Sequence, residues 1–132
     1  MAKRSRQVTS RNIELFTEIS GDQNPLHYDL QVARQVARAT RFGGIVVQGG
    51  MTSAILNAVV SEDLPGPGTV FLQVNWSFRA PVRPGDKITG EVKVLKARED
   101  KPITELETRV ITSDGTIVLE GSAVCYSMPI HN

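Results

Sequence analysis

Residues 50–80 read GMTSAILNAVVSEDLPGPGTVFLQVNWSFRA, and the stretch changes character at its middle. Its first part is apolar at positions three and four apart from Met51 onward, and Leu56 and Val60 add apolar surface on the other side. This spacing predicts a helix from about residue 50 to 61. A helix that is apolar most of the way round is a buried one.

The second part of the stretch alternates between apolar and polar residues after the turn-forming Pro65-Gly66-Pro67-Gly68. Such alternation predicts a half-buried antiparallel strand over residues 69–80. The apolar set, which we expect on one face of that strand, is Val70, Leu72, Val74, Trp76 and Phe78.

The flanking sequence supplies the remaining elements. After the helix and strand above, further strands are expected at about 87–98, 102–112 and 116–128, joined by short turns. Before them, the pattern indicates a short strand at 3–9, a helix at 11–20 that Thr9 or Ser10 caps and Gly21 ends, and a short helix at 30–38. Helices thus lie in the first half and strands in the second. The chain is expected to be one α+β domain, residues 1–132, with an antiparallel sheet curled around a central buried helix.

Composition excludes several classes of protein. The chain has 132 residues and a formal net charge of +1, which demands neither nucleic acid nor an anionic membrane as a partner. It has no apolar run of the ~20 residues that a membrane span needs, and its basic start lacks the apolar segment of a secretory signal. Cys125 is the single cysteine, in an apolar alternating segment, so we expect a buried small hydrophobe in a reducing cytoplasm. No Cys/His cluster has the spacing of a metal site.

The loop that follows the first helix carries the candidate chemistry. Asp22, Asn24 and His27 lie within one tight segment around Pro25. An aspartate and a neutral imidazole around one water can divide the work of a base and an acid. An aspartate in a turn can equally well cap backbone N–H groups, and the residues alone leave both interpretations open.

A second candidate feature is Gln48-Gly49-Gly50-Met51, at the start of the expected buried helix. Free N–H groups and the positive end of the helix dipole meet there, which favours a developing oxyanion. The alternative is that the glycines serve close packing between the helix and the sheet.

Several motifs in this order resemble one family. Gly21-Asp22-Gln23-Asn24-Pro25-Leu26-His27, preceded by Phe16-Thr17-Glu18-Ile19-Ser20, is similar to the signature of MaoC-like, (R)-specific enoyl-CoA hydratases. The resemblance covers about residues 10–128. It extends through Arg41-Phe42-Gly43-Gly44, Leu64-Pro65-Gly66-Pro67-Gly68, Phe78-Arg79-Ala80-Pro81-Val82, Pro84-Gly85-Asp86 and Arg98-Glu99-Asp100-Lys101-Pro102.

The resemblance implies a hot-dog fold, a homodimer and hydration of a trans-2-enoyl thioester without metal or redox cofactor. It implies that Asp22 and His27 are catalytic and that the Gly49 N–H binds the substrate carbonyl. We expect Asn24 to orient the loop or the Asp22 carboxylate, and Gln48, Gly50 and Met51 to line the substrate site.

Two residues depart from the family pattern. Gln48 stands where the family usually has histidine, and Gly50 where many members have methionine, so the pocket mouth and the accepted acyl groups are in question. Arg41, Arg79 and Arg83 are candidates for binding the nucleotide of coenzyme A, although each can also be a solvated surface residue. The rival functions are a hot-dog acyl-CoA thioesterase and a non-catalytic acyl-binding subunit.

Overall fold

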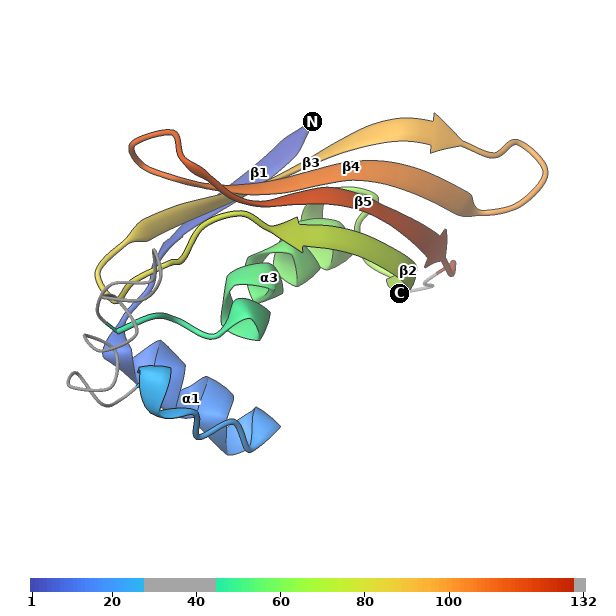
Figure 1. Cartoon of the computed structure of the whole chain (residues 1–132). Helices are drawn as coiled ribbons and strands as arrows, with labels where there is room; N and C mark the ends of the chain where they lie inside the picture. Colours follow the sequence, from blue (N-terminus) through green and yellow to red (C-terminus); the bar gives the residue numbers. More distant parts are fainter. Residues whose placement is uncertain (28–44, 130–132) are drawn as a thin grey trace.

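The chain, described here from a computed structural model, forms one antiparallel sheet with helices on one side (Figure 1). The structure describes residues 1–27 and 45–129, so the helix expected at 30–38, together with Arg41, lies outside the described residues. The sheet has five strands in the order β1-β3-β4-β5-β2. The strands are β1 (Ala2–Gln7), β2 (Thr69–Phe78), β3 (Lys87–Ala97), β4 (Ile103–Thr112) and β5 (Ile117–Ser127).

The helix α3 (Gly49–Ala58) lies against one face of the curled sheet and continues into the π-helical turn η2 (Val59–Asp63). Side chains from both elements meet the inner faces of the strands, and burying each large one contributes about 1.5–3 kcal/mol. This is the α+β, hot-dog arrangement that the sequence predicts. Fully buried members of the core include Leu56, Val59, Ile88, Leu106 and Leu119.

The helix α1 (Ser10–Ser20) lies farther from the sheet than α3 and ends at the candidate loop (Figure 1). Thr9 caps its start in a reciprocal pair, because the Thr9 side chain accepts from the Asn12 N–H and the Asn12 side chain accepts from the Thr9 N–H. Gly21 ends it in the left-handed conformation, with φ 75°, and donates its N–H to the Thr17 carbonyl at 2.8 Å. The predicted cap and stop are confirmed, and Asp22 follows directly.

Strand β2 corrects one prediction. Its pairing with β5 shifts register between Phe71 and Gln73, so the strand bulges. Phe71 and Trp76, five positions apart, therefore both pack against the core, with their rings edge to face at a centroid distance of 5.7 Å. A single apolar face over residues 70–78 was the wrong expectation, because the bulge reverses the alternation. Val70, for instance, is 43% exposed.

Beyond the bulge, the pairing of β2 with β5 includes one position that has no room for a side chain. A Cβ placed on Gly121 would lie 1.9 Å from the backbone oxygen of Asn75, on the neighbouring strand. Only a glycine fits beneath that carbonyl. In residues 1–27 and 45–129, no helix is long and apolar enough to cross a membrane.

Candidate active site

Asp22 and His27 meet in the loop after α1. His27 ends the 3-10 turn η1 (Pro25–His27), and its Nε2 lies 3.4 Å from Oδ2 of Asp22. The His27 side chain is 9% exposed and the Asp22 side chain 39% exposed. The pair therefore has a sheltered imidazole and a carboxylate that solvent or a ligand can reach.

Local hydrogen bonds fix the shape of this loop. The Asp22 Oδ1 accepts from the Asn24 N–H at 3.0 Å, and the Asn24 Oδ1 accepts from the Leu26 N–H at 3.1 Å. The Asn24 carbonyl also accepts from the His27 N–H at 3.0 Å. Asp22 thus does cap a backbone N–H, but with only one carboxylate oxygen, while the other faces His27.

The tautomer of His27 follows from its second contact. Its Nδ1 lies 2.6 Å from the carbonyl oxygen of Val46. A carbonyl can only accept, so Nδ1 carries the hydrogen, and in the neutral ring Nε2 is left as an acceptor. When the ring is neutral, two acceptors, Nε2 of His27 and Oδ2 of Asp22, face each other at 3.4 Å. The sequence did not indicate Val46, because a backbone carbonyl leaves no signature in a residue pattern.

The same contact ties the imidazole to the segment that enters α3. Val46 stands three positions before Gly49, the first residue of that helix. The Gly49 N–H has no acceptor within its own helix and none among the described residues. The Gly49 N–H, a backbone donor at the positive end of the helix dipole, thus follows closely in sequence after the Val46 carbonyl that contacts His27.

Gln48 holds α1 against this helix start. Its side chain is buried, and its Nε2 donates to the Ile13 carbonyl and to Oγ1 of Thr17, both at 3.1 Å. Its Oε1 is buried without a hydrogen-bond partner in the described part of the chain. Gln48 thus has a structural role that the sequence did not indicate. The substrate contact expected of it stays a prediction.

Both glycines after Gln48 also lie close to aromatic side chains. A Cβ on Gly50 would lie 2.2 Å from Cζ of Phe16, and a Cβ on Gly49 would lie 3.1 Å from Cε1 of Phe78. Phe16 of α1 and Phe78 of β2 therefore pack closely against the helix start. Steric packing and oxyanion binding, the two alternatives left open by the sequence, are compatible at Gly49.

Two of the three arginines considered for nucleotide binding, Arg79 and Arg83, have partners within the described residues, and nucleotide binding by them stays a prediction. Arg79 pairs with Glu120 at 3.2 Å on the exposed sheet, and Arg83 donates to the Ile45 carbonyl at 3.3 Å. Met51 lines a groove between α3 and β1. Among residues 1–27 and 45–129 no group of three His, Cys, Asp or Glu side chains could hold a metal ion.

The chain matches the family model described as "MaoC like domain" over residues 1–116. It is 36% identical to an (R)-specific enoyl-CoA hydratase of Aeromonas caviae over 123 residues, which span 93% of this chain and 89% of that protein. It is 33% identical to a 3-hydroxybutyryl-CoA dehydratase of Methylorubrum extorquens, over 90% of this chain and 73% of the relative.

Solved structures agree with these matches. An (R)-hydratase of A. caviae involved in PHA biosynthesis superposes with a TM-score of 0.87 at 35% identity, covering 96% of this chain and 93% of the other. An R-hydratase of Pseudomonas aeruginosa in its unliganded form gives 0.83 at 29% identity, covering 99% and 85%. Fold and loop together define a hot-dog protein of the hydratase type. The chain belongs to the MaoC-like domain family.

Proposed function

We propose that this protein is an (R)-specific enoyl-CoA hydratase, a hydro-lyase of fatty acid metabolism. It adds water to trans-2-enoyl thioesters to give (R)-3-hydroxyacyl thioesters, and it also catalyses the reverse dehydration. The observation that carries the proposal is the 3.4 Å approach of Oδ2 of Asp22 to Nε2 of His27, both of which are acceptors when the ring is neutral. One water can donate one O–H to each and so satisfy both.

The proposed step balances without a cofactor. Asp22 removes a proton from the held water as the water oxygen forms a bond to C3 and the C2–C3 π electrons move toward the thioester carbonyl. His27 keeps the water oriented and, with Asp22, passes that proton to C2 as the enolate collapses. General acid–base groups of this kind contribute typically 10²–10⁴-fold.

The enolate oxygen is proposed to bind at the Gly49 N–H, where the helix dipole and a fixed donor stabilise developing charge. Gln48, Gly50 and Met51 flank this donor and would shape the site around the acyl group. Asn24 would keep Asp22 in place through its N–H, which donates to Oδ1 at 3.0 Å. We place the reaction in the cytoplasm, where the single Cys125 thiol would stay reduced.

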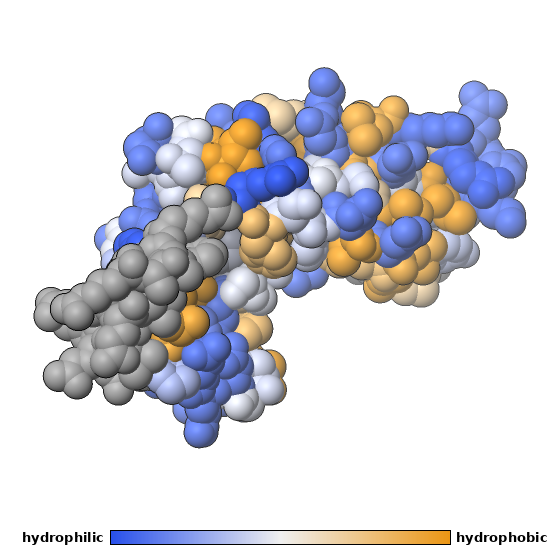
Figure 2. All heavy atoms as spheres, viewed as in Figure 1, coloured by the Kyte–Doolittle hydropathy of each residue, from blue (hydrophilic) through white to orange (hydrophobic). Residues whose placement is uncertain are grey.

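We further propose that the protein is a homodimer. Strand β2 is one edge of the sheet and carries exposed apolar side chains: Val70, Leu72, Val74 and Phe78 are 43–57% exposed. Figure 2 shows apolar side chains exposed among polar ones over the sheet on the face in view. An open apolar edge is usually paired or covered, and a two-fold axis would pair it with its own copy. Light scattering should give twice the chain mass of 14.4 kDa. Val74→Lys should weaken the dimer, whereas Val94→Lys on β3, a control of similar exposure, should not; a fully active monomer would contradict the proposal.

The activity is tested by following the loss of enoyl-thioester absorbance with crotonyl-CoA and then determining the configuration of the product. Hydration to the (R)-3-hydroxy product supports the proposal. Release of free thiol, measured with a thiol dye, would instead indicate a thioesterase. Saturable binding of acyl-CoA without turnover would indicate a non-catalytic subunit.

A further inference from the structure

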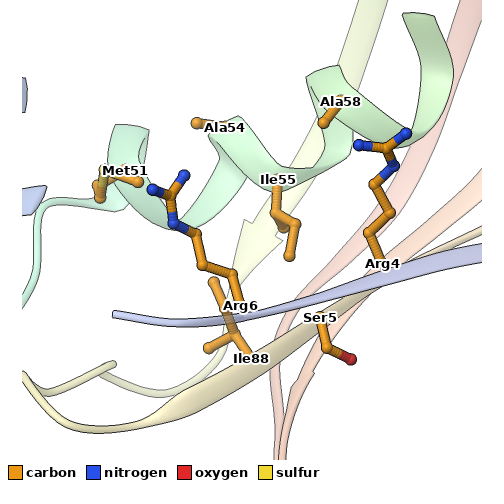
Figure 3. Close-up of a pocket in the computed structure, with 8 residues that line it drawn as sticks. All are labelled: Arg4, Ser5, Arg6, Met51, Ala54, Ile55, Ala58 and Ile88. Atoms are coloured by element: carbon orange, nitrogen blue, oxygen red, sulfur yellow. The ribbon is translucent and has the colours of Figure 1, made fainter. Parts of the chain in front are cut away.

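A groove separate from the Asp22–His27 pair lies between β1 and α3 (Figure 3). Its open volume is about 310 Å³. The apolar lining comes from one side of α3 and from β3, and two guanidinium groups rise from β1 toward the helix. The residues that matter are Ala54, Ile55, Ala58 and Ile88 for the apolar part and Arg4 and Arg6 for the charged part.

The two arginines differ in their hydrogen bonds and ion pairs. Arg4 is held by Asp63, with Nε to Oδ2 at 2.6 Å and Nη2 to Oδ1 at 3.1 Å. The Arg6 guanidinium has no hydrogen bond or ion pair with any residue in the ranges 1–27 and 45–129. The groove therefore presents one uncommitted cation beside an apolar surface.

The uncommitted charge lies at one end of the groove. Figure 3 shows the Arg6 guanidinium near Met51, in the first turn of α3, and the Arg4 guanidinium toward Ala58. The positive end of the α3 dipole adds to the potential near Arg6. The groove is thus polarised along the helix, with its anion-attracting end at Met51 and an apolar run toward Ala58.

Arginine stems often lie on apolar surface merely to cover it, with the head in water. Here the stems of Arg4 and Arg6 leave about 310 Å³ open. A single positive head group with an apolar run behind it matches a ligand of one negative charge and one apolar tail. Coenzyme A, with its several phosphate charges, calls for more uncommitted cations than the groove offers.

We propose that this groove binds a fatty-acid carboxylate, with the carboxylate paired to Arg6 and the alkyl chain lying along Ala54 and Ala58 over Ile55 and Ile88. The Arg6 fork suits a carboxylate because it can donate two parallel hydrogen bonds. The proposal does not rest on the hydratase function, since it involves neither Asp22 nor His27, although Met51 borders both this groove and the proposed acyl site.

Calorimetric titration with octanoate tests it, with saturating butyryl-CoA present to occupy the proposed active site. We expect one saturable site for octanoate and at least tenfold weaker binding of octan-1-ol. Arg6→Gln should weaken octanoate binding about tenfold, the effect of losing a charge-assisted pair. Ala58→Leu, which fills the tail end, should weaken it as well, with a thermal melt to verify folding.

Lys3→Gln is the matched control, because Lys3 is a cation on the same strand but does not line the groove. It should leave octanoate binding within twofold of wild type. The proposal is overturned if octanoate does not saturate, if butyryl-CoA displaces it, or if Lys3→Gln weakens binding as much as Arg6→Gln. Since Arg6 is exposed, its variant should fold and decides the matter even if Ala58→Leu does not.

Discussion

The loop of Asp22 and His27 and the first turn of α3 are connected through the Val46 carbonyl, but they are held in different ways. Within the loop, the side chains of Asp22 and Asn24 accept hydrogen bonds from N–H groups two positions ahead, so residues near in sequence determine its shape. The turn depends on distant contacts, from Gln48 to α1 and from Phe78 of β2 to Gly49. The loop supplies side-chain acceptors, and the turn supplies a backbone donor. Changes in the loop should therefore affect chemistry more than stability, and changes in the turn should affect both.

The largest effect is expected in the loop. Asp22→Asn removes the charge that polarises water, and His27→Ala removes the second acceptor, so each should lower crotonyl-CoA hydration by about 10²–10⁴-fold. The double variant should be little worse than the poorer single one, because the two residues act on one water. Steady-state rates and thermal melts on all three variants measure this. A large loss of melting temperature with near-normal turnover in both single variants would reassign the pair to a structural role.

The second largest effect is expected at Gly49, where two variants distinguish the role of the N–H from the role of packing. Gly49→Val should cost about 2.7–4 kcal/mol of transition-state stabilisation, because the side chain displaces the thioester carbonyl from the N–H. It also crowds Phe78, whose Cε1 lies 3.1 Å from the added Cβ. Adding Phe78→Ala relieves that crowding. Stability should then recover in part while turnover stays low, and recovery of full turnover would show that Gly49 matters only for packing.

A smaller effect is expected at Gln48. Gln48→Met keeps the volume but removes the donor to Ile13 and Thr17, so the free energy of unfolding should fall by about 1–3 kcal/mol. Turnover of the folded variant should fall less than tenfold, since Gln48 acts through the position of α1. Urea unfolding and initial rates measure both quantities. Thr17→Val, which removes one of the two acceptors, should show a smaller share of the same loss.

The smallest effect is expected at the buried Cys125, whose reactivity reports unfolding in variants of either region. Burial raises the pKa of the Cys125 thiol to about 11, so the thiol stays protonated and unreactive at neutral pH. Because the pKa of the thiol in the unfolded chain is near 9.0, this group favours the folded state below pH 9 and loses that contribution as pH rises toward 11. A thiol dye at pH 8 should label Cys125 only through unfolding. The labelling rate should match wild type in the Asp22 and His27 variants and be faster in Gln48→Met. Equal labelling rates in all variants would show that the loop and the start of α3 do not differ in their contribution to stability.

Much of the fold could be predicted because its signals are local. The periodicity after residue 50, the glycine after α1 and the turns between the later strands each determine an element with nearby residues. The bulge of β2 could not be predicted in this way, since it arises from pairing with β5 across the sheet.

The candidate site also combines local features, which could be predicted, with tertiary contacts, which could not. Asp22 and His27 are close in sequence, so a motif can bring them together. The Val46 carbonyl, the Phe16 ring over Gly50 and the direction of the Gln48 side chain depend on how α1 docks against α3. These contacts are tertiary, and the spacing of residues within either helix does not encode them.

The close approach of the Asn75 carbonyl to Gly121 also governs how β2 can be assembled. A slip of β2 by one residue along β5 would place Glu120 or Ser122 beneath a carbonyl that leaves no room for a Cβ. We therefore expect this contact to disfavour misaligned pairings of β2 with β5. We therefore expect the exposed Val70, Leu72 and Val74 to tolerate substitution without loss of the alignment between β2 and β5.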